Sequence, residues 1–331
     1  MSIEIKVQRV GKGDCIWLKY GKENKVNIII DSGTATKAKE FRNIIKSISE
    51  SNEVIDLLIL THIDNDHING FKKYISKNDG KIIKEVWFHG KGVKAYAINA
   101  PHSPKSAIQL EGIMEQRKMN VNHNIFKGYK KTINEAELCI LTPTREAVRR
   151  VGTIVDQYVS PHGGGVHNQD LDWIYKNDEY IRDNSDTNAA SISFVFSYEG
   201  KNIAFLGDAH AEDIIDSKND FYNGINMDLV KLPHHGSSHN ITEDLMKCLL
   251  CNNFIISTNQ PVDKNTIARV VNSVEKSTIY CNYSWWDCNG YYTKKDREEY
   301  VYKEKLIMKE LKKDEIIFSD EGCNIWELKK N

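Results

Sequence analysis

The segment LILTHIDNDHINGF, residues 58–71, constrains this chain more than any other, because a dense polar run directly follows an aliphatic one. Residues 54–60 (VIDLLIL) are predicted to form a strand that is buried on both faces, and residues 67–78 to form a helix. Two histidines and two aspartates lie between them within six residues. A buried loop tolerates that density of ligand-type side chains only when a cation lies among them.

The spacing of these four side chains predicts a metal site. In an extended strand exit, alternate side chains face one way, so His62, Asp64 and Asp66 can converge. A helix that begins at His67 turns that imidazole back toward the same space. Imidazole and carboxylate ligands suit zinc, manganese or iron. The alternative is a surface loop in which Asp66 caps the helix, which explains one aspartate and neither histidine.

Two later polar clusters also follow aliphatic strands. FLGDAH contains Asp208, and KLPHHGSSH contains His234 and His235. Catalytic loops are commonly held at strand ends by a rigid scaffold. Asp208 and His235, added to the first four side chains, are enough ligands for a two-metal site, because one carboxylate can bridge two ions about 3.5–4 Å apart.

The order of predicted elements places these clusters in one α/β chain. Strands and helices alternate up to about residue 90 and again from about residue 190, where a hairpin is expected to turn at Glu199 and Gly200. Residues 91–185 mix short helical pieces with loops, and we expect an insertion that serves as a lid or substrate platform. Residues 296–313, rich in lysine and glutamate, are predicted to form a solvated helix, and residues 323–329 a last strand.

Composition narrows the function classes. The chain has 331 residues, with 45 lysines and arginines interleaved with 46 acidic residues. This balance argues against long-range capture of nucleic acid by a strongly positive surface, but leaves a local basic groove open. No segment resembles a signal peptide or approaches the roughly 20 apolar residues of a membrane span. With seven cysteines interpreted as reduced thiols, we expect a cytoplasmic protein without membrane association.

These motifs carry a resemblance to a known family. THIDNDH resembles the HxHxDH signature of the metallo-β-lactamase superfamily, and more closely its variant in the hydrolase domain of ComEC-type DNA-uptake proteins and their soluble relatives. Four further segments resemble that branch in its order: VGKGDCIWLKYG (10–21), IIIDSG (28–33), ASISFVFSYEGKNIAFLGDA (190–209) and LVKLPHHGS (229–237). The resemblance covers residues 3–90 and 186–282. It implies a single domain over residues 1–331 with a four-layer αββα sandwich, in which residues 91–185 are a partly helical insertion.

The resemblance also implies a set of metal ligands. His62 and Asp64 would serve a first ion, Asp66 and His67 a second, Asp208 would bridge them and His235 would complete the second site. We prefer His235 to His234 because PHHG resembles the PGHG of related enzymes. His234 is then left to bind or protonate a phosphate oxygen. Asp64 replaces a histidine of the common signature, which favours manganese over zinc or a single bound ion.

Other residues are predicted to support this site. A third histidine for the first ion is usual in the superfamily, and the candidates are His162 and His167, with His89 behind them. The alternative for the loop around residue 160 is a flexible glycine-rich surface turn. Ser237 is predicted to contact substrate. Lys231 is predicted to stabilise a phosphorane-like transition state, with a solvated strand-end lysine as the alternative.

Asp14 and Asp31 are predicted to stand behind the ligands. A ligating histidine usually donates its other N–H to a carboxylate or carbonyl, and either aspartate could accept it. The alternative for each is a turn aspartate that bonds its own backbone.

The favoured hypothesis is a metal-dependent phosphodiesterase or nuclease. It would use one or two divalent ions, zinc or manganese, and a metal-bound hydroxide oriented by Asp66, on a phosphodiester substrate such as nucleic acid or a nucleotide. A second hypothesis is hydrolysis of a lactone, thioester or small phosphoester on the same scaffold, because fold does not determine function. A third is a binding or signalling module that has lost turnover. The sequence names no protein partner.

Overall fold

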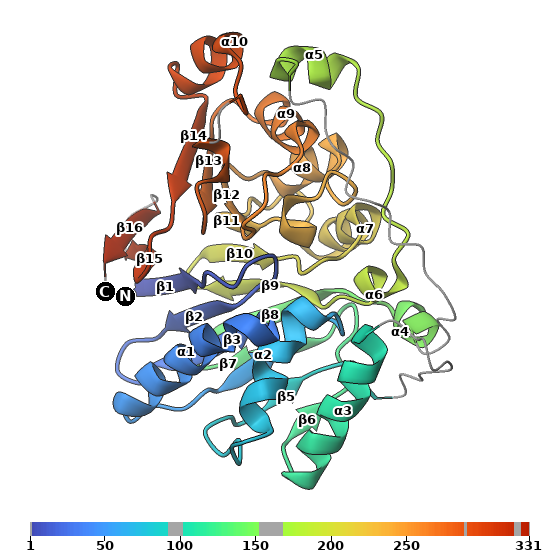
Figure 1. The fold of residues 1–331 in the computed structure, drawn as a ribbon, viewed down its shortest axis with the longest axis vertical. Coiled ribbons are helices and arrows are strands. Elements are labelled where there is room, and N and C mark those ends of the chain that lie inside the picture. The colour runs from blue at the N-terminus through green and yellow to red at the C-terminus, as the bar shows by residue number, and fades with distance from the viewer. Residues whose placement is uncertain (1, 92–101, 152–167, 288–289, 321–325, 331) are drawn as a thin grey trace. The chain divides into compact units, whose positions relative to one another are not determined.

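The computed structural model describes residues 2–91, 102–151, 168–287, 290–320 and 326–330 (Figure 1). The chain divides into two compact units. Unit 1 comprises residues 1–126, 144–157 and 311–331, and unit 2 comprises residues 127–143 and 158–310. Each unit contains one eight-stranded sheet with its own helices. The α/β class is therefore confirmed, with two large sheets consistent with the αββα fold.

The sheet of unit 1 has the strand order β16-β15-β1-β2-β3-β4-β5-β6. Its strands are β1 (Ser2–Val7), β2 (Ile16–Tyr20), β3 (Val26–Ile30), β4 (Leu57–Ile59), β5 (Val86–Trp87), β6 (Val121–Asn122), β15 (Glu315–Asp320) and β16 (Glu327–Lys330). The helices are η1 (Ala35–Lys37), α1 (Ala38–Glu50), α2 (Asn65–Ile75), α3 (His102–Gln116) and α4 (Arg145–Val151). Pairing is antiparallel from β16 to β3 and parallel from β3 to β6.

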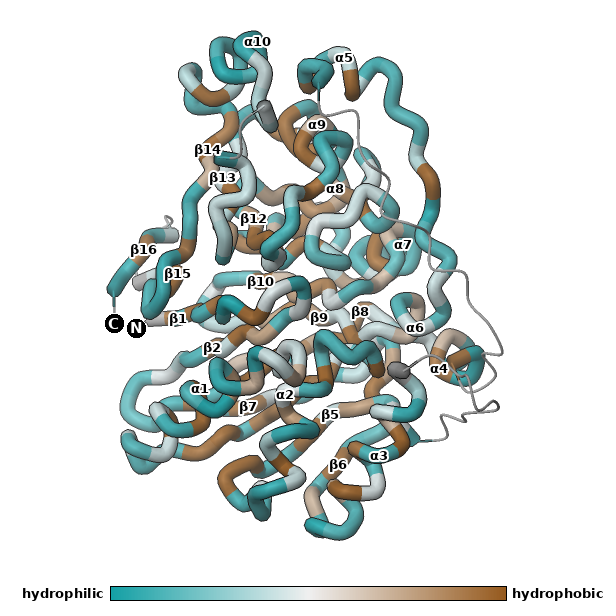
Figure 2. Tube along the Cα trace, viewed as in Figure 1, coloured by the Kyte–Doolittle hydropathy of each residue, from teal (hydrophilic) through white to brown (hydrophobic). Residues whose placement is uncertain are grey.

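The parallel part of this sheet positions the first polar cluster. Strands β3 and β4 are aliphatic and buried along their whole length, as expected for parallel strands covered on both faces. Helix α1 connects them and buries Phe41, Ile44, Ile45 and Ile48 at the spacing of one helical face. In Figure 2 the tube of α1 alternates between hydrophilic and hydrophobic colours. Because the carboxyl ends of parallel strands meet at one edge, the loop after β3 lies beside the loop that joins β4 to α2.

The sheet of unit 2 has the order β14-β13-β12-β11-β10-β9-β8-β7. Its strands are β7 (Lys130–Ile133), β8 (Ala136–Thr142), β9 (Ser193–Tyr198), β10 (Lys201–Phe205), β11 (Leu229–Lys231), β12 (Asn253–Ile256), β13 (Ser277–Cys281) and β14 (Leu306–Glu310). The helices are α5 (Leu171–Lys176), α6 (Asp186–Ala189), α7 (Ala211–Tyr222), η2 (Pro233–Gly236), α8 (Glu243–Leu249), α9 (Lys264–Ser273), η3 (Trp285–Asp287), α10 (Lys294–Asp296) and η4 (Arg297–Val301).

The expected hairpin of unit 2 is present. Strands β9 and β10 pair antiparallel, and the two residues between them, Glu199 and Gly200, have φ values of 48° and 76°. Two consecutive positive φ angles define the type I′ turn, whose twist matches that of the flanking strands. Strands β10 to β14 are parallel, so the loops after β10 and β11, which carry Asp208 and the two histidines of PHHG, leave the same edge of the sheet.

Two predictions about elements need correction. Residues 296–313 do not form one helix: they contain η4 and then β14, which pairs in parallel with β13. The described part of residues 91–185 is richer in strands than expected, because it supplies β6 to unit 1 and the β7–β8 hairpin to unit 2. Its role as a lid stays a prediction. Among the described residues, no helix combines the length and apolar character of a membrane span.

Candidate metal-binding clusters

The predicted ligands fall into two clusters, one in each unit. The N-terminal cluster, in unit 1, comprises Asp14, Asp31, His62, Asp64, Asp66 and His67. The C-terminal cluster, in unit 2, comprises Asp183, Asn188, Asp208, His234, His235 and Asn240.

Asp31 organises the N-terminal cluster. Its side chain is fully buried just after β3, and its Oδ1 accepts a hydrogen bond from the Thr61 backbone N–H at 2.8 Å. Its Oδ2 accepts from the Thr61 hydroxyl at 2.8 Å and lies 2.8 Å from His67 Nδ1. The backbone of Asp31 is left-handed, with φ 56°, a conformation that aspartate tolerates better than most residues.

These bonds determine which nitrogen of each histidine carries a proton. Because Asp31 is a carboxylate, His67 donates through Nδ1. The Thr61 hydroxyl donates its one proton to Asp31, so it can only accept a hydrogen bond from His62 Nδ1, which lies 3.0 Å from Thr61 Oγ1. Both rings therefore present Nε2 as the remaining nitrogen, which is the arrangement that metal-ligating histidines usually adopt. The two ring centroids are 4.1 Å apart.

Asp14, Asp31 and His67 lie close together in the N-terminal cluster. One ligand atom from each lies within 4.8 Å of the others, and all three residues are buried. Since Asp31 accepts from His67 Nδ1, it lies behind the ring, and Nε2 is the nitrogen of His67 that can bind an ion. Imidazole and carboxylate groups are donors suited to divalent cations such as zinc or manganese, so the residues present fit a metal ion.

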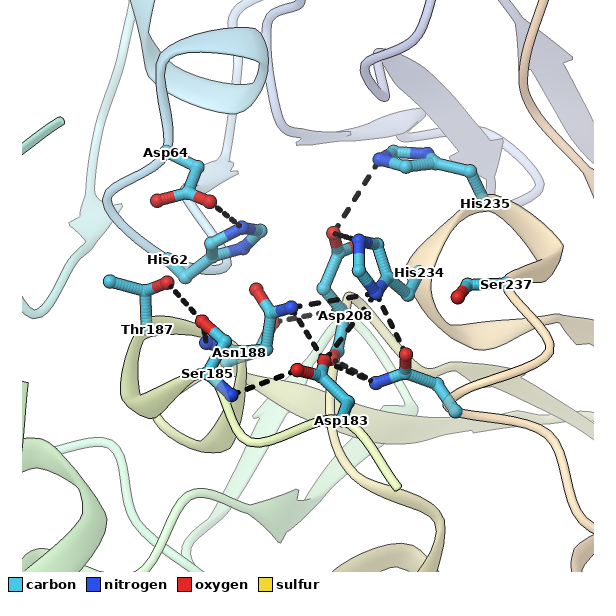
Figure 3. A network of polar contacts seen from close by, with 12 residues as sticks. His62, Asp64, Asp183, Ser185, Thr187, Asn188, Asp208, His234, His235 and Ser237 are labelled. Atoms are coloured by element: carbon cyan, nitrogen blue, oxygen red, sulfur yellow. Dashed lines mark hydrogen bonds and ion pairs between the residues drawn. The ribbon is translucent and has the colours of Figure 1, made fainter. Parts of the chain in front are cut away.

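The start of α2 differs from the prediction. The helix begins at Asn65 and not at His67, so Asp64 occupies the N-cap position, although its side chain makes no cap hydrogen bond. Its Oδ2 instead lies 3.7 Å from His62 Nε2 (Figure 3). Asp66 lies in the first turn, where the helix dipole favours a carboxylate. A Cβ on Gly13 would lie 1.8 Å from the Asp66 carbonyl oxygen, so this approach requires glycine.

Asp208 and the two histidines form the centre of the C-terminal cluster. Asp208 is buried after β10, and its backbone N–H donates to Ser191 Oγ at 3.0 Å. Its Oδ2 lies 3.5 Å from His235 Nε2 and 3.8 Å from His234 Nε2 (Figure 3). His234 and His235 both have left-handed backbones, with φ values of 46° and 55°. Two such residues in sequence are strained, and strain of this kind concentrates at functional sites.

Three residues that the sequence did not indicate hold His234. Its Nδ1 donates to Asn240 Oδ1 at 2.7 Å and lies 3.5 Å from Asp183 Oδ2 (Figure 3). Asp183 Oδ2 accepts in turn from Asn188 Nδ2 at 2.7 Å and from Asn240 Nδ2 at 2.9 Å. Such polar residues occur in many loops, and nothing in the sequence distinguishes these three.

The charges in this cluster shift two pKa values. Burial alone would lower the pKa of His234, but the carboxylates of Asp208 and Asp183 outweigh it and raise the pKa to about 9. Burial alone would raise the pKa of Asp183, but the hydrogen bond and charge of His234, together with Asn188, hold it well below its usual range.

The structure also locates other residues that were predicted to support the site. Lys231 is buried at the end of β11, so it is not the solvated lysine of the alternative. Ser237 closes the turn after the histidines, because its N–H donates to the His234 carbonyl at 2.8 Å. His89 is buried, its Nε2 donates to the Ile125 carbonyl at 2.7 Å, and burial lowers its pKa to about 4. His162 and His167 lie outside the described residues.

Comparison with protein families identifies the N-terminal cluster's surroundings. Residues 9–101 match the family model described as the metallo-beta-lactamase superfamily, and this range contains the whole N-terminal cluster. This part of the chain is therefore similar to the metallo-beta-lactamase superfamily, whose members are generally metal-dependent hydrolases. No comparison singles out the ComEC-like branch, which stays a prediction. Among curated proteins, none matches this chain.

Solved structures show only distant similarity. CmlA, a diiron beta-hydroxylase from Streptomyces venezuelae, is 13% identical over 85% of this chain and 44% of its own length, with a TM-score of 0.37. This chain thus spans less than half of that protein. The metallo-beta-lactamase fold protein YhfI from Bacillus subtilis is 8% identical over 84% of this chain and 96% of its own, with a TM-score of 0.47. These similarities are too low to indicate an activity.

Proposed function

We propose that this protein is a metal-dependent phosphodiesterase or nuclease. The observation that carries the proposal is that His62 and His67 both present Nε2, because Asp31 and Thr61 fix the proton positions on the two rings. The carboxylates of Asp14 and Asp31 are buried close to His67, and burying two carboxylates beside each other is costly unless positive charge lies among them. A divalent ion, zinc or manganese, would supply that charge, and the superfamily match over the same residues supports it.

Each cluster contains proposed ligands. They are His62, Asp64, Asp66 and His67 from the N-terminal cluster and Asp208 and His235 from the C-terminal cluster. One or two divalent ions held by these residues would supply Lewis-acid stabilisation of the phosphoryl oxygens and lower the pKa of a water molecule.

The remaining roles belong to the chain's own side chains. Asp66 is proposed to orient the attacking water and accept its proton. His234 is proposed to donate a proton to the leaving oxygen, since Asn240 holds its Nδ1 and so fixes the orientation of the ring. Lys231 is proposed to offset the charge that develops on the phosphoryl oxygens. Two cationic groups suit a phosphodiester better than a neutral ester, which has no charge before attack.

The test is turnover of a generic chromogenic phosphodiester by protein that has been stripped of metal and then given manganese or zinc. We expect metal-dependent hydrolysis that Asp66→Asn reduces by about 10²- to 10⁴-fold, the usual contribution of a general base. Asp79→Asn removes an exposed carboxylate of the same unit and is the matched control. Hydrolysis of a lactone or thioester in place of the diester, or tightly bound metal with no turnover of any of them, would contradict the proposal.

Metal content tests the ligand assignment separately. His67→Ala and Asp208→Asn change one cluster each, and each is expected to lower the number of ions bound per chain. Unchanged metal content in Asp208→Asn would remove Asp208 from the ligand set, whatever the activity of the variant.

A further inference from the structure

An open groove of about 620 Å³ lies between α2 and α3 in unit 1. Helix α2 lines it with Asn69, Lys72, Lys73 and Ser76, which are spaced as one face of a helix. Helix α3 lines it with Gln109, Gly112, Ile113 and Gln116, so this side is partly apolar. The groove therefore continues along the same helix whose first turn carries two of the proposed metal ligands.

The charged side chains that line the groove are basic. Its described lining includes two lysines and no acidic side chain. Lys72 Nζ donates to Ser106 Oγ at 3.0 Å and to Gln109 Oε1 at 3.1 Å, and Lys73 Nζ donates to the Ala35 carbonyl at 3.1 Å. All three acceptors are neutral. Within the described ranges, neither lysine has a carboxylate at ion-pair distance.

Lys72 is an unusual lysine for a surface helix. It is partly buried, and that burial lowers its pKa because desolvation disfavours the charged form. Surface lysines normally extend their ammonium group into water, whereas this one is tied to a serine and a glutamine inside the groove. A partly buried cation whose hydrogen-bond partners are all neutral favours binding of an anion.

A glycine keeps the groove open. Gly112 lies within α3, where glycine costs about 1 kcal/mol relative to alanine. A Cβ at this position would meet nothing within 4 Å, so packing does not require glycine here. The absent side chain instead leaves space in the groove, which Gly112 lines.

The lysines lie a short distance along α2 from its first turn. Lys72 follows His67 by five residues, or about 7.5 Å along the helix axis. A strand whose backbone follows the helix from that turn would pass both lysines.

We propose that the groove between α2 and α3 binds the backbone of single-stranded nucleic acid, so that the substrate is an oligonucleotide. The identification of the strand as substrate rests on the proposed function. Lys72 and Lys73 contact phosphates, and the amides of Asn69 and Gln109 bond phosphate or sugar oxygens, contacts that position a strand without selecting its sequence.

The experiment uses two different ways to disable the groove. Lys72→Gln combined with Lys73→Gln removes its charge. Gly112→Leu places an apolar side chain in it without changing charge, at a position where a Cβ meets nothing within 4 Å. Lys46→Gln, at an exposed lysine of α1 in the same unit, is the control. Binding of a fluorescent single strand of about 12 nucleotides is measured by anisotropy in chelator, and KM for the same strand is measured with manganese.

We expect both groove variants to weaken binding and raise KM for the strand by about tenfold, while Lys46→Gln matches the wild type. Wild-type affinity and KM in both groove variants would overturn the inference. So would tighter binding of a duplex of the same sequence, or hydrolysis of the small diester with no binding of the strand. If wild type cleaves neither substrate, the proposed function fails, and loss of strand binding in the variants still supports the groove as a nucleic-acid site.

Discussion

Asp31 is the residue on which most of the N-terminal cluster depends. One buried carboxylate accepts from the Thr61 N–H, the Thr61 hydroxyl and His67, and through that hydroxyl it also determines the proton position on His62. Its left-handed backbone admits asparagine, which has the same shape but lacks the charge. Asp31 can therefore be tested without rebuilding the turn that holds it.

We expect Asp31→Asn to weaken metal binding by about 10- to 100-fold, the usual effect of changing the group behind a ligating histidine. The variant should also lose about 1–3 kcal/mol of stability, because an amide cannot accept every hydrogen bond that the buried carboxylate accepts. The measurements are calorimetric titration with manganese or zinc and denaturant unfolding. Asp56→Asn is the control, since Asp56 accepts from the Asn27 N–H at 2.9 Å, before the start of β4. Equal metal affinity in both variants would contradict the role of Asp31.

The difference between Asp31 and Asp183 shows what sequence can predict for single residues. Asp31 was predicted to stand behind a histidine because it follows an aliphatic strand and belongs to a recognisable motif. Asp183 lies beside Nδ1 of His234, as Asp31 lies beside Nδ1 of His67. It is 25 residues before Asp208 in the sequence, and only folding brings Asp183 and Asp208 to the same histidine. The start of α2 was also predicted wrongly: it is Asn65 and not His67, because several residues in that segment could serve as the cap.

Two glycines within helices of unit 1 have opposite reasons for being there. A Cβ on Gly70 of α2 would lie 1.9 Å from the Ser32 carbonyl oxygen, whereas one on Gly112 of α3 would meet nothing within 4 Å. Gly70 thus allows α2 to approach the loop after β3, next to Asp31.

Gly70→Ala should lower the stability of the protein by about 1–3 kcal/mol, because the new methyl group forces the helix away from that loop. Gly112→Ala should raise it by up to about 1 kcal/mol, since alanine is the better helix former. Thermal unfolding midpoints of the two variants and the wild type test this pair. A fall in the midpoint for Gly112→Ala, or none for Gly70→Ala, would show that the contacts described here do not control the helix positions.

Helix α3 also carries a group whose ionisation should oppose folding. Burial, together with the nearby charge of Glu115, raises the pKa of Glu111 to about 7, although Lys91 acts in the opposite direction. His123 Nδ1 lies 3.6 Å from its carboxylate. An acid with a raised pKa in the folded state contributes stability below its unfolded pKa of about 4.3, and this contribution is lost as the pH rises through about 7.

Glu111→Gln keeps the side chain neutral at every pH. Its stability relative to wild type should therefore increase between about pH 5 and pH 8, as the wild-type carboxyl ionises. The difference between the two unfolding midpoints, measured across this range, is the test. Glu50→Gln, at the exposed end of α1, should show no such trend. A difference that stays constant or shrinks toward pH 8 would contradict the buried, protonated state of Glu111.

Element predictions succeeded where pattern and local geometry agreed. The β9–β10 hairpin was predicted from two apolar runs around Glu-Gly, and the turn itself supplies the positive φ angles that closure requires. Residues 296–313 were predicted as a helix from their lysine and glutamate content. In the structure, Leu306 is buried and residues 306–310 add a strand to the edge formed by β13. Pairing with an existing sheet overrides local propensity, and the sequence of the segment alone does not contain that partner.

Over the whole molecule, acidic and basic residues are nearly equal in number, but among the residues that line the proposed binding site they are not. Acidic and basic residues differ by one over the chain, yet the groove between α2 and α3 has lysines without acidic neighbours in its described lining. A protein of this kind cannot attract nucleic acid over long distances, and its affinity must come from a few local phosphate contacts. That limits how strongly binding can depend on salt.

Each phosphate contact with a single strand contributes about −0.7 to the slope of log affinity against log salt, so two lysines give about −1.4. Raising salt from about 50 to about 200 mM should therefore weaken strand binding about sevenfold, far less than for proteins with many phosphate contacts. The Lys72→Gln, Lys73→Gln variant should lose most of this dependence, whereas Lys46→Gln should retain it. The same anisotropy titrations at several salt concentrations supply both slopes. If strand binding by the double variant still depends steeply on salt, binding takes place on a broad basic surface outside the groove. If the slope is the same in all three proteins, Lys72 and Lys73 do not contact phosphates.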